Sequence, residues 1–304
     1  MTLLTILSRM LLLILLGFFA AHVGIITPSG RKTITDLVVL MVYPCYILNG
    51  FIKNIGMFSG GEMLFTLFVS VIQGVFVLVL SLFVFRKAAA GRRPILRYAT
   101  VVSNTAFLGL PMMENLFGSA GLLVSSIFVI PNRVNTFGIA VNFFTAKEGE
   151  KLGKRLRGML TQPSIVATVV GIAIVLTEVR PPEWCVNTLS SVAACSTPLA
   201  MMVIGAVIQD NLKQMRLRPL TMQLCLLRLV VIPLVVYAAC RAAHLDRVLM
   251  GTAVLFAAMP AGSTVALYAD KYDADVAYAG EVVLMSTLLS ILTLPIWCYL
   301  CMYV

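Results

Sequence analysis

Two arginines stand in the middle of long apolar stretches of this sequence. Arg133 and Arg228 are each flanked on both sides by residues such as Val, Leu, Ile and Phe. A central Arg costs about 2.5–3.5 kcal/mol on scales of insertion into a bilayer, so it usually faces a cavity or a polar partner. A guanidinium also binds a carboxylate through paired N–H bonds. These two arginines are therefore the first place to look for binding of a small anion.

Amide side chains accompany Arg133. Asn132, Asn135 and Asn142 are spaced so that a regular helix would carry them on one face. A stripe of amides beside a guanidinium would offer several N–H donors to a carboxylate. We therefore predict that Asn132, Arg133 and Asn135 bind substrate. The alternative is that these amides form hydrogen bonds between helices.

Arg228 has two possible polar partners at membrane depth, which are Gln73 and Glu281. These three residues form a predicted coupling or structural polar group. Glu281 is either a proton- or cation-coupling group or an acid at the membrane interface, and its place near the start of the last apolar stretch favours the interface.

Proline interrupts two other apolar stretches. The first reads Asn104-Thr105-Ala106-Phe107-Leu108-Gly109-Leu110-Pro111, and the second reads Met259-Pro260-Ala261-Gly262-Ser263-Thr264. Proline removes a donor and clashes with the carbonyl one turn back, and the freed backbone groups must avoid lipid. We expect new helices to begin near Pro111 and Pro260, with N–H groups that bind an anion. The alternative is a simple kink. The predicted substrate-binding residues are Asn104, Thr105, Pro111, Asn132, Arg133, Asn135, Pro260, Ser263 and Thr264.

The composition requires that most of the chain lies in lipid. Apolar residues make up 60% of the 304 residues and charged residues 12%, whereas soluble proteins have about 25% charged residues. The mean hydropathy is +0.97. A helix needs about 20 apolar residues to cross a bilayer. Ten such windows are present: 3–22, 34–55, 63–85, 95–116, 121–144, 163–178, 185–209, 219–242, 247–269 and 276–303.

The basic residues lie in alternate gaps between these windows. Sixteen Lys and Arg follow the odd-numbered windows, and four follow the even-numbered ones. Cytoplasmic loops carry the excess of Lys and Arg. We therefore place the odd-numbered gaps in the cytoplasm and both termini on the extracytoplasmic side of the plasma (inner) membrane. The net charge of +10 reflects this topology rather than binding of nucleic acid.

The two halves of the chain resemble each other. The spacing from Gly17 to Pro44 equals that from Gly171 to Pro198, and the fourth window of each half carries the proline break. Five spans per half is an odd number, so the halves would have opposite orientations. We predict an all-α membrane protein of ten transmembrane helices, built as two inverted five-helix repeats with broken crossover helices 4 and 9. The repeats are residues 1–148 and 161–304, with a cytoplasmic linker at 149–160.

Other chemistries find little support in the sequence. Cys298 and Cys301 have no histidine or second cysteine pair near them, so we expect packing rather than a metal site. The phosphate-binding pattern of ATP-driven pumps is missing, as is a hydrolytic constellation at depth. We expect no cofactor and no enzymatic activity.

Several stretches together resemble the auxin efflux carrier family, which includes bacterial malonate and malate carriers. They are Leu16-Gly17-Phe18 with Gly24-Ile25-Ile26, Val42-Tyr43-Pro44, the stretches 104–111 and 259–261, Thr197-Pro198-Leu199-Ala200 with Ile204-Gly205-Ala206, and Arg228-Leu229-Val230. The resemblance covers nearly the whole chain. It implies a fold like that of the bile-acid symporter superfamily, with a scaffold of helices 1, 2, 6 and 7, which is the expected homodimer contact. Helices 3–5 and 8–10 would form a mobile transport domain that moves like an elevator, with Asn104, Pro111 and Pro260 at the crossover.

These observations predict a secondary active transporter in the lipid bilayer for a small organic anion. The resemblance favours a mono- or dicarboxylate such as malonate or malate. Na+ and H+ are the candidate coupling ions, although Gln73 stands where some relatives have an acid, which argues against simple proton coupling. The alternatives are an anion channel and a membrane sensor without coupled transport.

Overall fold

The computed structural model describes residues 3–144, 161–212 and 215–303. The predicted linker at 149–160 lies outside these residues. Within the described ranges the regular structure is helical, and the only extended pairing is an isolated bridge between two residues. The predicted all-α class is therefore confirmed for this part of the chain.

Seven helical segments of the described part are long and apolar enough to cross a membrane. They are Leu3–His22, Pro28–Ile52, Gly60–Phe83, Thr105–Phe143, Glu183–Asn211, Pro219–Ala242 and Val276–Tyr303. Two shorter apolar helices, Pro163–Thr177 and Arg247–Ala258, accompany them. Many large apolar side chains on these helices are exposed, for example Leu4, Phe68 and Leu292. An exposed apolar surface of this kind is suited to lipid, so the chain is a multi-pass membrane protein.

The helices group into two compact units. Unit 1 comprises residues 1–67, 106–128 and 160–210, and unit 2 comprises residues 68–105, 129–159 and 211–304. The helices α4 (Gly60–Phe83) and α6 (Leu110–Arg133) each contribute residues to both units.

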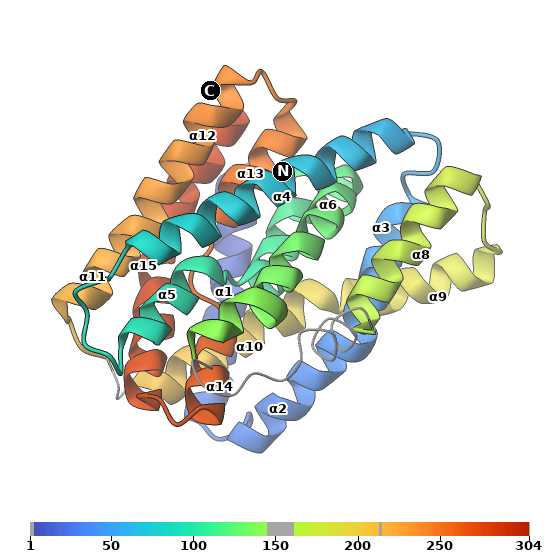
Figure 1. The fold of residues 1–304 in the computed structure, drawn as a ribbon. Helices are drawn as coiled ribbons and strands as arrows, with labels where there is room; N and C mark the ends of the chain where they lie inside the picture. The colour runs from blue at the N-terminus through green and yellow to red at the C-terminus, as the bar shows by residue number, and fades with distance from the viewer. Residues whose placement is uncertain (1–2, 145–160, 213–214, 304) are drawn as a thin grey trace. The chain divides into compact units, whose positions relative to one another are not determined.

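Unit 1 is held together by close helix packing at glycines. In Figure 1, α3 (Tyr43–Ile52) lies beside α8 (Pro163–Thr177) and α9 (Glu183–Ala194). A Cβ atom on Gly171 of α8 would lie 2.4 Å from the Phe51 ring of α3, and a Cβ atom on Gly205 of α10 would lie 2.0 Å from the Ile14 carbonyl oxygen of α1. Small residues let membrane helices approach in this way. The elements of unit 1 are α1 (Leu3–His22), α2 (Pro28–Leu37), the π-helical turn η1 (Val38–Val42), α3 (Tyr43–Ile52), residues 106–109 of the π-helical turn η2 (Thr105–Gly109), α8 (Pro163–Thr177), α9 (Glu183–Ala194) and α10 (Ser196–Asn211).

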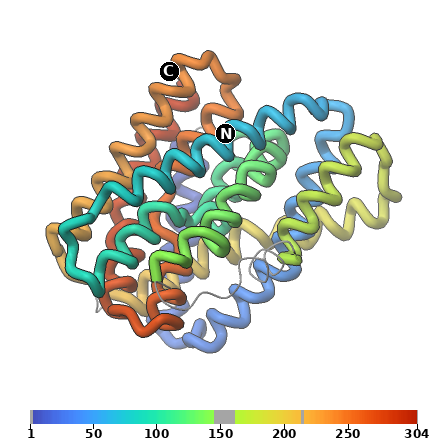
Figure 2. Tube along the Cα trace, viewed as in Figure 1, coloured from blue at the N-terminus to red at the C-terminus, as the bar shows by residue number. Residues whose placement is uncertain are grey.

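Unit 2 holds the interrupted pair α13 (Arg247–Ala258) and α14 (Thr264–Lys271), the first part of the other interrupted helix, α5 (Arg93–Val101), and the long helix α15 (Val276–Tyr303). In Figures 1 and 2, α13 packs against both α12 (Ile232–Ala242) and α15, and α14 packs against α15. Its elements are α5 (Arg93–Val101), the π-helical turn η3 (Val134–Ile139), the 3-10 turn η4 (Ala140–Phe143), α11 (Pro219–Leu226), the π-helical turn η6 (Leu227–Val231), α12 (Ile232–Ala242), α13 (Arg247–Ala258), α14 (Thr264–Lys271) and α15 (Val276–Tyr303).

Three of the π-helical turns end two residues before a proline. The turn η1 ends two residues before Pro44 of α3, η2 two residues before Pro111 of α6, and η6 two residues before Pro233 of α12. A proline ring clashes with the carbonyl four residues earlier, and a widened turn relieves that clash. For Pro233 this carbonyl belongs to Leu229, and it accepts a 2.8 Å hydrogen bond from Trp297 Nε1 of α15. The indole therefore satisfies the acceptor that the proline leaves open.

One glycine divides the longest apolar segment. Gly118 has φ 65° and ψ −155° inside α6, a conformation that L side chains rarely adopt. The helix axis changes direction there, so Leu110–Arg133 is two helices joined by a sharp bend rather than one continuous rod.

Candidate functional site

The two interrupted helices meet inside unit 2. The helix α5 ends at Val101 and α13 ends at Ala258, and the residues that follow each end are extended. Ser103 and Ala261 form an antiparallel bridge. The chain segments 102–104 and 259–262 therefore lie against each other as two short unwound strands, one from each half of the sequence.

Backbone hydrogen bonds join these two segments. The Asn104 N–H donates to the Pro260 carbonyl at 2.9 Å, and the Gly262 N–H donates to the Val102 carbonyl at 3.2 Å. A third N–H, that of Ala261, donates to the Ser286 hydroxyl of α15 at 3.1 Å. Buried backbone groups must find partners of this kind where no water reaches them. The crossing is thus fixed by three bonds.

These bonds correct one expectation about the second break. Pro260 does not open the second half-helix, because α14 begins at Thr264 with Ser263 as its N-cap residue. Pro260 lies in the unwound segment, where its carbonyl accepts the Asn104 N–H. The N–H groups of Asn104, Ala261 and Gly262 are also engaged, so they are not the anion-binding donors that the proline pattern predicted.

At the first break the helix resumes close to the predicted place. Thr105 is buried and begins the π-helical turn η2, and α6 begins at Leu110 with Pro111 in its first turn. Pro111 belongs to unit 1, where its carbonyl accepts a 2.7 Å bond from the Asn115 side chain. The other predicted binding residues belong to unit 2.

Arg228 is bound to both interrupted helices. Its Nε donates to the Met259 carbonyl at 2.9 Å, and its Nη1 donates to the Ala99 carbonyl at 2.9 Å and also to the Thr100 carbonyl. The residue is 2% exposed. Ala99 and Thr100 lie in the last turn of α5, and Met259 is the C-cap residue of α13. Arg228 therefore caps the C-terminal ends of both broken helices.

The predicted partners of Arg228 bind elsewhere. Gln73 donates to the Ala253 carbonyl in the middle of α13 at 3.0 Å, and Glu281 binds the side chains of Thr221 and Arg218. Neither Gln73 nor Glu281, the two possible partners suggested by the sequence, forms a hydrogen bond or ion pair with Arg228 among the described residues. The sequence offered no reason to consider main-chain carbonyls as partners, but a helix that stops inside the membrane exposes four of them.

The amides near Arg133 are connected to the crossing. Asn132 Nδ2 donates to the Ser103 hydroxyl at 3.1 Å, and Thr136 Oγ1 donates to the Asn132 carbonyl at 2.8 Å. Asn132 thus links the end of α6 to the unwound segment. The guanidinium carbon of Arg133 lies 5.6 Å from the centre of the Phe137 ring, which is within the range of a cation–π contact.

The predicted stripe of three asparagines does not form. The π-helical turn η3 and the 3-10 turn η4 follow Arg133, so the helix changes its pitch after Arg133. Asn135 is buried, and its Nδ2 would lie 2.8 Å from a Cβ atom on Gly74 of α4. Asn142 is exposed. Asn135 therefore packs against a glycine of α4 instead of extending a common face with Asn142.

An aromatic cluster lies beside α14, and the sequence reasoning missed it. The ring of Tyr268 lies 5.4 Å from that of Tyr98, 6.4 Å from that of Phe137 and 6.0 Å from that of Tyr272. The sequence feature that could have predicted this cluster is the four-residue spacing of Thr264, Tyr268 and Tyr272, which puts them on one helical face. Thr264, one turn before Tyr268, has a buried hydroxyl oxygen.

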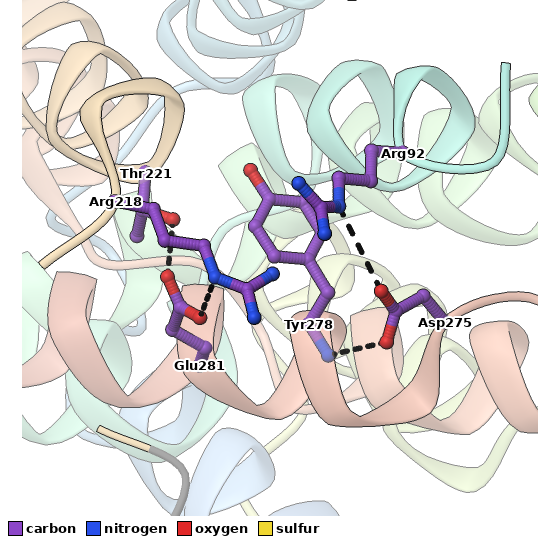
Figure 3. A network of polar contacts seen from close by, with 6 residues as sticks. All are labelled: Arg92, Arg218, Thr221, Asp275, Tyr278 and Glu281. Carbon is purple, nitrogen blue, oxygen red and sulfur yellow. Dashed lines mark hydrogen bonds and ion pairs between the residues drawn. The ribbon is translucent and has the colours of Figure 1, made fainter. Parts of the chain in front are cut away.

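Glu281 takes part in a separate polar network at the start of α15, drawn in Figure 3. Its carboxylate accepts a 2.7 Å bond from Thr221 Oγ1 and lies 3.2 Å from Arg218 Nε, and Glu281 itself is 1% exposed. The guanidinium carbons of Arg218 and Arg92 lie 5.4 Å and 5.0 Å from the centre of the Tyr278 ring. Glu281 is therefore a buried, ion-paired acid.

No group of three or more His, Cys, Asp or Glu side chains that could hold a metal ion is found among the described residues. Cys298 and Cys301 are both buried as free thiols on α15.

A sequence model of the family described as "Membrane transport protein" matches residues 2–155 and 148–298. The chain belongs to the membrane transport protein family. Two similar proteins also carry a transport description. An uncharacterized transporter of Methanothermobacter thermautotrophicus is 25% identical over 299 residues, covering 96% of each chain. An uncharacterized transporter of Methanocaldococcus jannaschii is 20% identical over 306 residues, covering 94% of this chain and 95% of the other.

Membership in a transport family agrees with the geometry of unit 2. Membrane transport proteins place non-helical backbone at membrane depth only where protein or a watery cavity surrounds it. The paired segments at Ser103 and Ala261 are non-helical backbone that interrupts helical segments. The crossing in unit 2 is accordingly the candidate functional site of this membrane transport protein.

Proposed function

We propose that this protein is a secondary active transporter that carries a small organic anion across the membrane by alternating access. The observation that carries the proposal is the pairing of the two unwound segments at Ser103 and Ala261. Carriers built from repeats bind their substrates where discontinuous helices meet. Transport of this kind involves binding and movement without covalent chemistry, so the proposed function includes no enzymatic activity.

The groups near the crossing favour an anion with an apolar part. Arg133 supplies a positive charge, and Ser263 and Thr264 stand at the N-terminal end of α14, where the helix dipole is positive. The side chain of Asn104 adds an amide one residue from the bridge. The rings of Phe137 and Tyr268 offer apolar surface nearby. A small carboxylate, with malonate and malate as the first candidates, matches these groups.

Ten spans in two inverted repeats remain our interpretation of the topology. A straight segment of 39 residues, Thr105–Phe143, would be about 58 Å long, nearly twice the hydrocarbon thickness of roughly 30 Å. The bend at Gly118 supports its division into two spans. With α8 and the interrupted pair α13–α14 added, the count reaches ten. The distribution of Lys and Arg supports an orientation with both termini on the extracytoplasmic side, and we propose the plasma (inner) membrane as the location.

The division into units supports a scaffold and a moving part. We assign helices 1, 2, 6 and 7 to a scaffold that also forms a homodimer contact, and helices 3–5 and 8–10 to a transport domain that moves like an elevator. Windows 1, 2, 6 and 7 fall in unit 1, and windows 8–10 fall in unit 2. Na+ and H+ are the coupling ions to compare, by measuring uptake in gradients of each.

A binding and uptake experiment with Arg133→Gln tests the proposal. A panel of mono- and dicarboxylates is first screened for stabilisation of the purified protein against thermal unfolding, and the best binder is used for uptake into proteoliposomes. Loss of a charge-assisted hydrogen bond is worth about 1.5–3 kcal/mol, so uptake at low substrate should fall about 10- to 100-fold. Arg180→Gln is the matched control, because Arg180 is exposed in the loop between α8 and α9.

The other outcomes separate the alternatives. Undiminished uptake by Arg133→Gln would remove Arg133 from the binding site. Unitary currents carried by the anion in planar bilayers would show a channel. Binding of a carboxylate without flux in either direction would show a sensor.

A further inference from the structure

A full positive charge occupies the place where the two interrupted helices end. All three hydrogen bonds of the Arg228 guanidinium go to main-chain carbonyls, two in the last turn of α5 and one at the C-cap of α13. Among the described residues, no carboxylate forms an ion pair with it. A charge this deeply buried is stable only if something of opposite sign compensates it.

The helix ends supply that compensation. The C-terminal end of a helix carries the equivalent of roughly half a negative elementary charge. Two such ends meet at Arg228, one from α5 and one from α13, so together they carry about one negative charge. The guanidinium and the two helix ends therefore balance without any acidic residue.

Carbonyl oxygens gathered at the ends of broken helices are ligands for a cation. In carriers with discontinuous helices, unwound carbonyls and half-helix C-terminal ends coordinate Na+ or H+. We propose that the Arg228 guanidinium takes the place of a coupling cation at this crossing. Where the proposed transport function holds, it follows that uptake needs no Na+ at this position, because the protein carries the cation as a side chain.

The neighbouring backbone directs the side chain to this place. Arg228 lies in the π-helical turn η6, which precedes Pro233. A π turn inserts one extra residue and so rotates the side chains that follow it. The hydrogen bond from Trp297 Nε1 to the carbonyl of Leu229, the residue after Arg228, also holds this turn in place. The guanidinium is thus attached to the chain at this position, whereas a free ion would exchange with solution.

Thermal unfolding of purified Arg228→Ala tests the cation site without any substrate. The melting temperature is measured in choline chloride, in NaCl and in a few millimolar guanidinium chloride, at constant ionic strength. We expect Arg228→Ala to melt below the wild type in choline. Guanidinium or Na+ should then raise its melting temperature saturably, on the order of 5 °C at a large excess over the Kd. The wild type should respond to NaCl no more than to choline.

Two outcomes would overturn the proposal. If Na+ and guanidinium both act on Arg228→Ala as choline does, the place left by the side chain is not a cation site. If the wild type shows a saturable response to Na+ that choline does not give, the arginine has not replaced a coupling ion.

Two further variants decide the matter even where Arg228→Ala does not fold. Arg228→Lys keeps a charge and should retain most of the wild-type stability in choline. Arg228→Met fills the same volume without a charge and should melt lower, with no recovery in NaCl. Equal melting temperatures for the Met variant and the wild type would show that the charge is not needed.

Uptake measurements test the second part of the proposal separately. Equal initial rates in NaCl and in choline chloride are expected for the wild type, and a strict requirement for Na+ would refute Na+ independence. Absence of any uptake would count against the proposed transport function and leave the thermal result for the cation site as it stands.

Discussion

The hydroxyl of Ser286 is expected to anchor the crossing, and Ser286→Ala removes it. The Ala261 N–H donates to this hydroxyl at 3.1 Å, and the hydroxyl itself donates to the Val283 carbonyl of its own helix at 3.1 Å. Both Ser286 and Ala261 are completely buried. Alanine at position 286 leaves the Ala261 N–H without a partner where water cannot replace it.

The size of the effect follows from the unpaired donor. A buried donor without a partner costs about 1–3 kcal/mol. At roughly 2 °C per kcal/mol for a protein of this size, the melting temperature should fall by about 2–6 °C. Thermal unfolding of the purified protein in detergent, followed by intrinsic fluorescence, measures this change.

Ser290→Ala is the matched control. Ser290 lies one turn further along α15, is buried to the same degree, and donates only to the Thr287 carbonyl of its own helix at 2.7 Å. Its removal leaves no donor unpaired, so Ser290→Ala should lose less than half as much. Amide hydrogen exchange at Ala261 should accelerate in Ser286→Ala alone. Equal melting temperatures for the two variants, with unchanged exchange at Ala261, would refute the anchoring role.

Two further substitutions test how helices are held within each unit. Gly205→Ala places a Cβ atom 2.0 Å from the Ile14 carbonyl oxygen, so α1 and α10 must separate, and a loss of about 1–3 kcal/mol or more is expected in thermal unfolding. Gly61→Ala, with 3.8 Å of room, should leave the melting temperature unchanged, and similar behaviour of the two variants would contradict the close packing. Trp297→Phe keeps the ring but removes the donor to the Leu229 carbonyl. We expect it to lower the melting temperature by an amount equivalent to about 1–3 kcal/mol, and a wild-type value would show that this carbonyl needs no partner.

The sequence located the interruptions of the helices because their causes are local. Prolines mark both breaks, and Asn104 and Ser263 beside them are residues that favour turns and caps. The pairing across the crossing could not be predicted in the same way. Which N–H reaches which carbonyl depends on how α5 and α13 approach each other, and that is a property of tertiary packing.

The asparagine stripe failed for a different reason. Its prediction assumed a constant 3.6 residues per turn through the segment after Pro131. The structure has a π-helical turn and a 3-10 turn there, so residues ten apart no longer share a face. Periodicity therefore gave the correct type of element but not the direction in which Asn142 points. A proline followed by several polar residues is the sequence signal that a regular helical period should not be extended.

The structure also distinguishes Arg228 from Arg133, whose sequence contexts are alike, in their ability to bind a substrate carboxylate. The Arg228 guanidinium is 2% exposed and bonded to three carbonyls, so binding a substrate carboxylate would require it to leave these acceptors unsatisfied. Each abandoned carbonyl would cost about 1–3 kcal/mol, which exceeds the gain from one new charge-assisted bond. Arg133 is only partly buried, and its guanidinium lies over the face of Phe137. A substrate that needs a positive charge in unit 2 should therefore select Arg133, and Arg133→Gln should weaken carboxylate binding while Arg228 variants act first on stability.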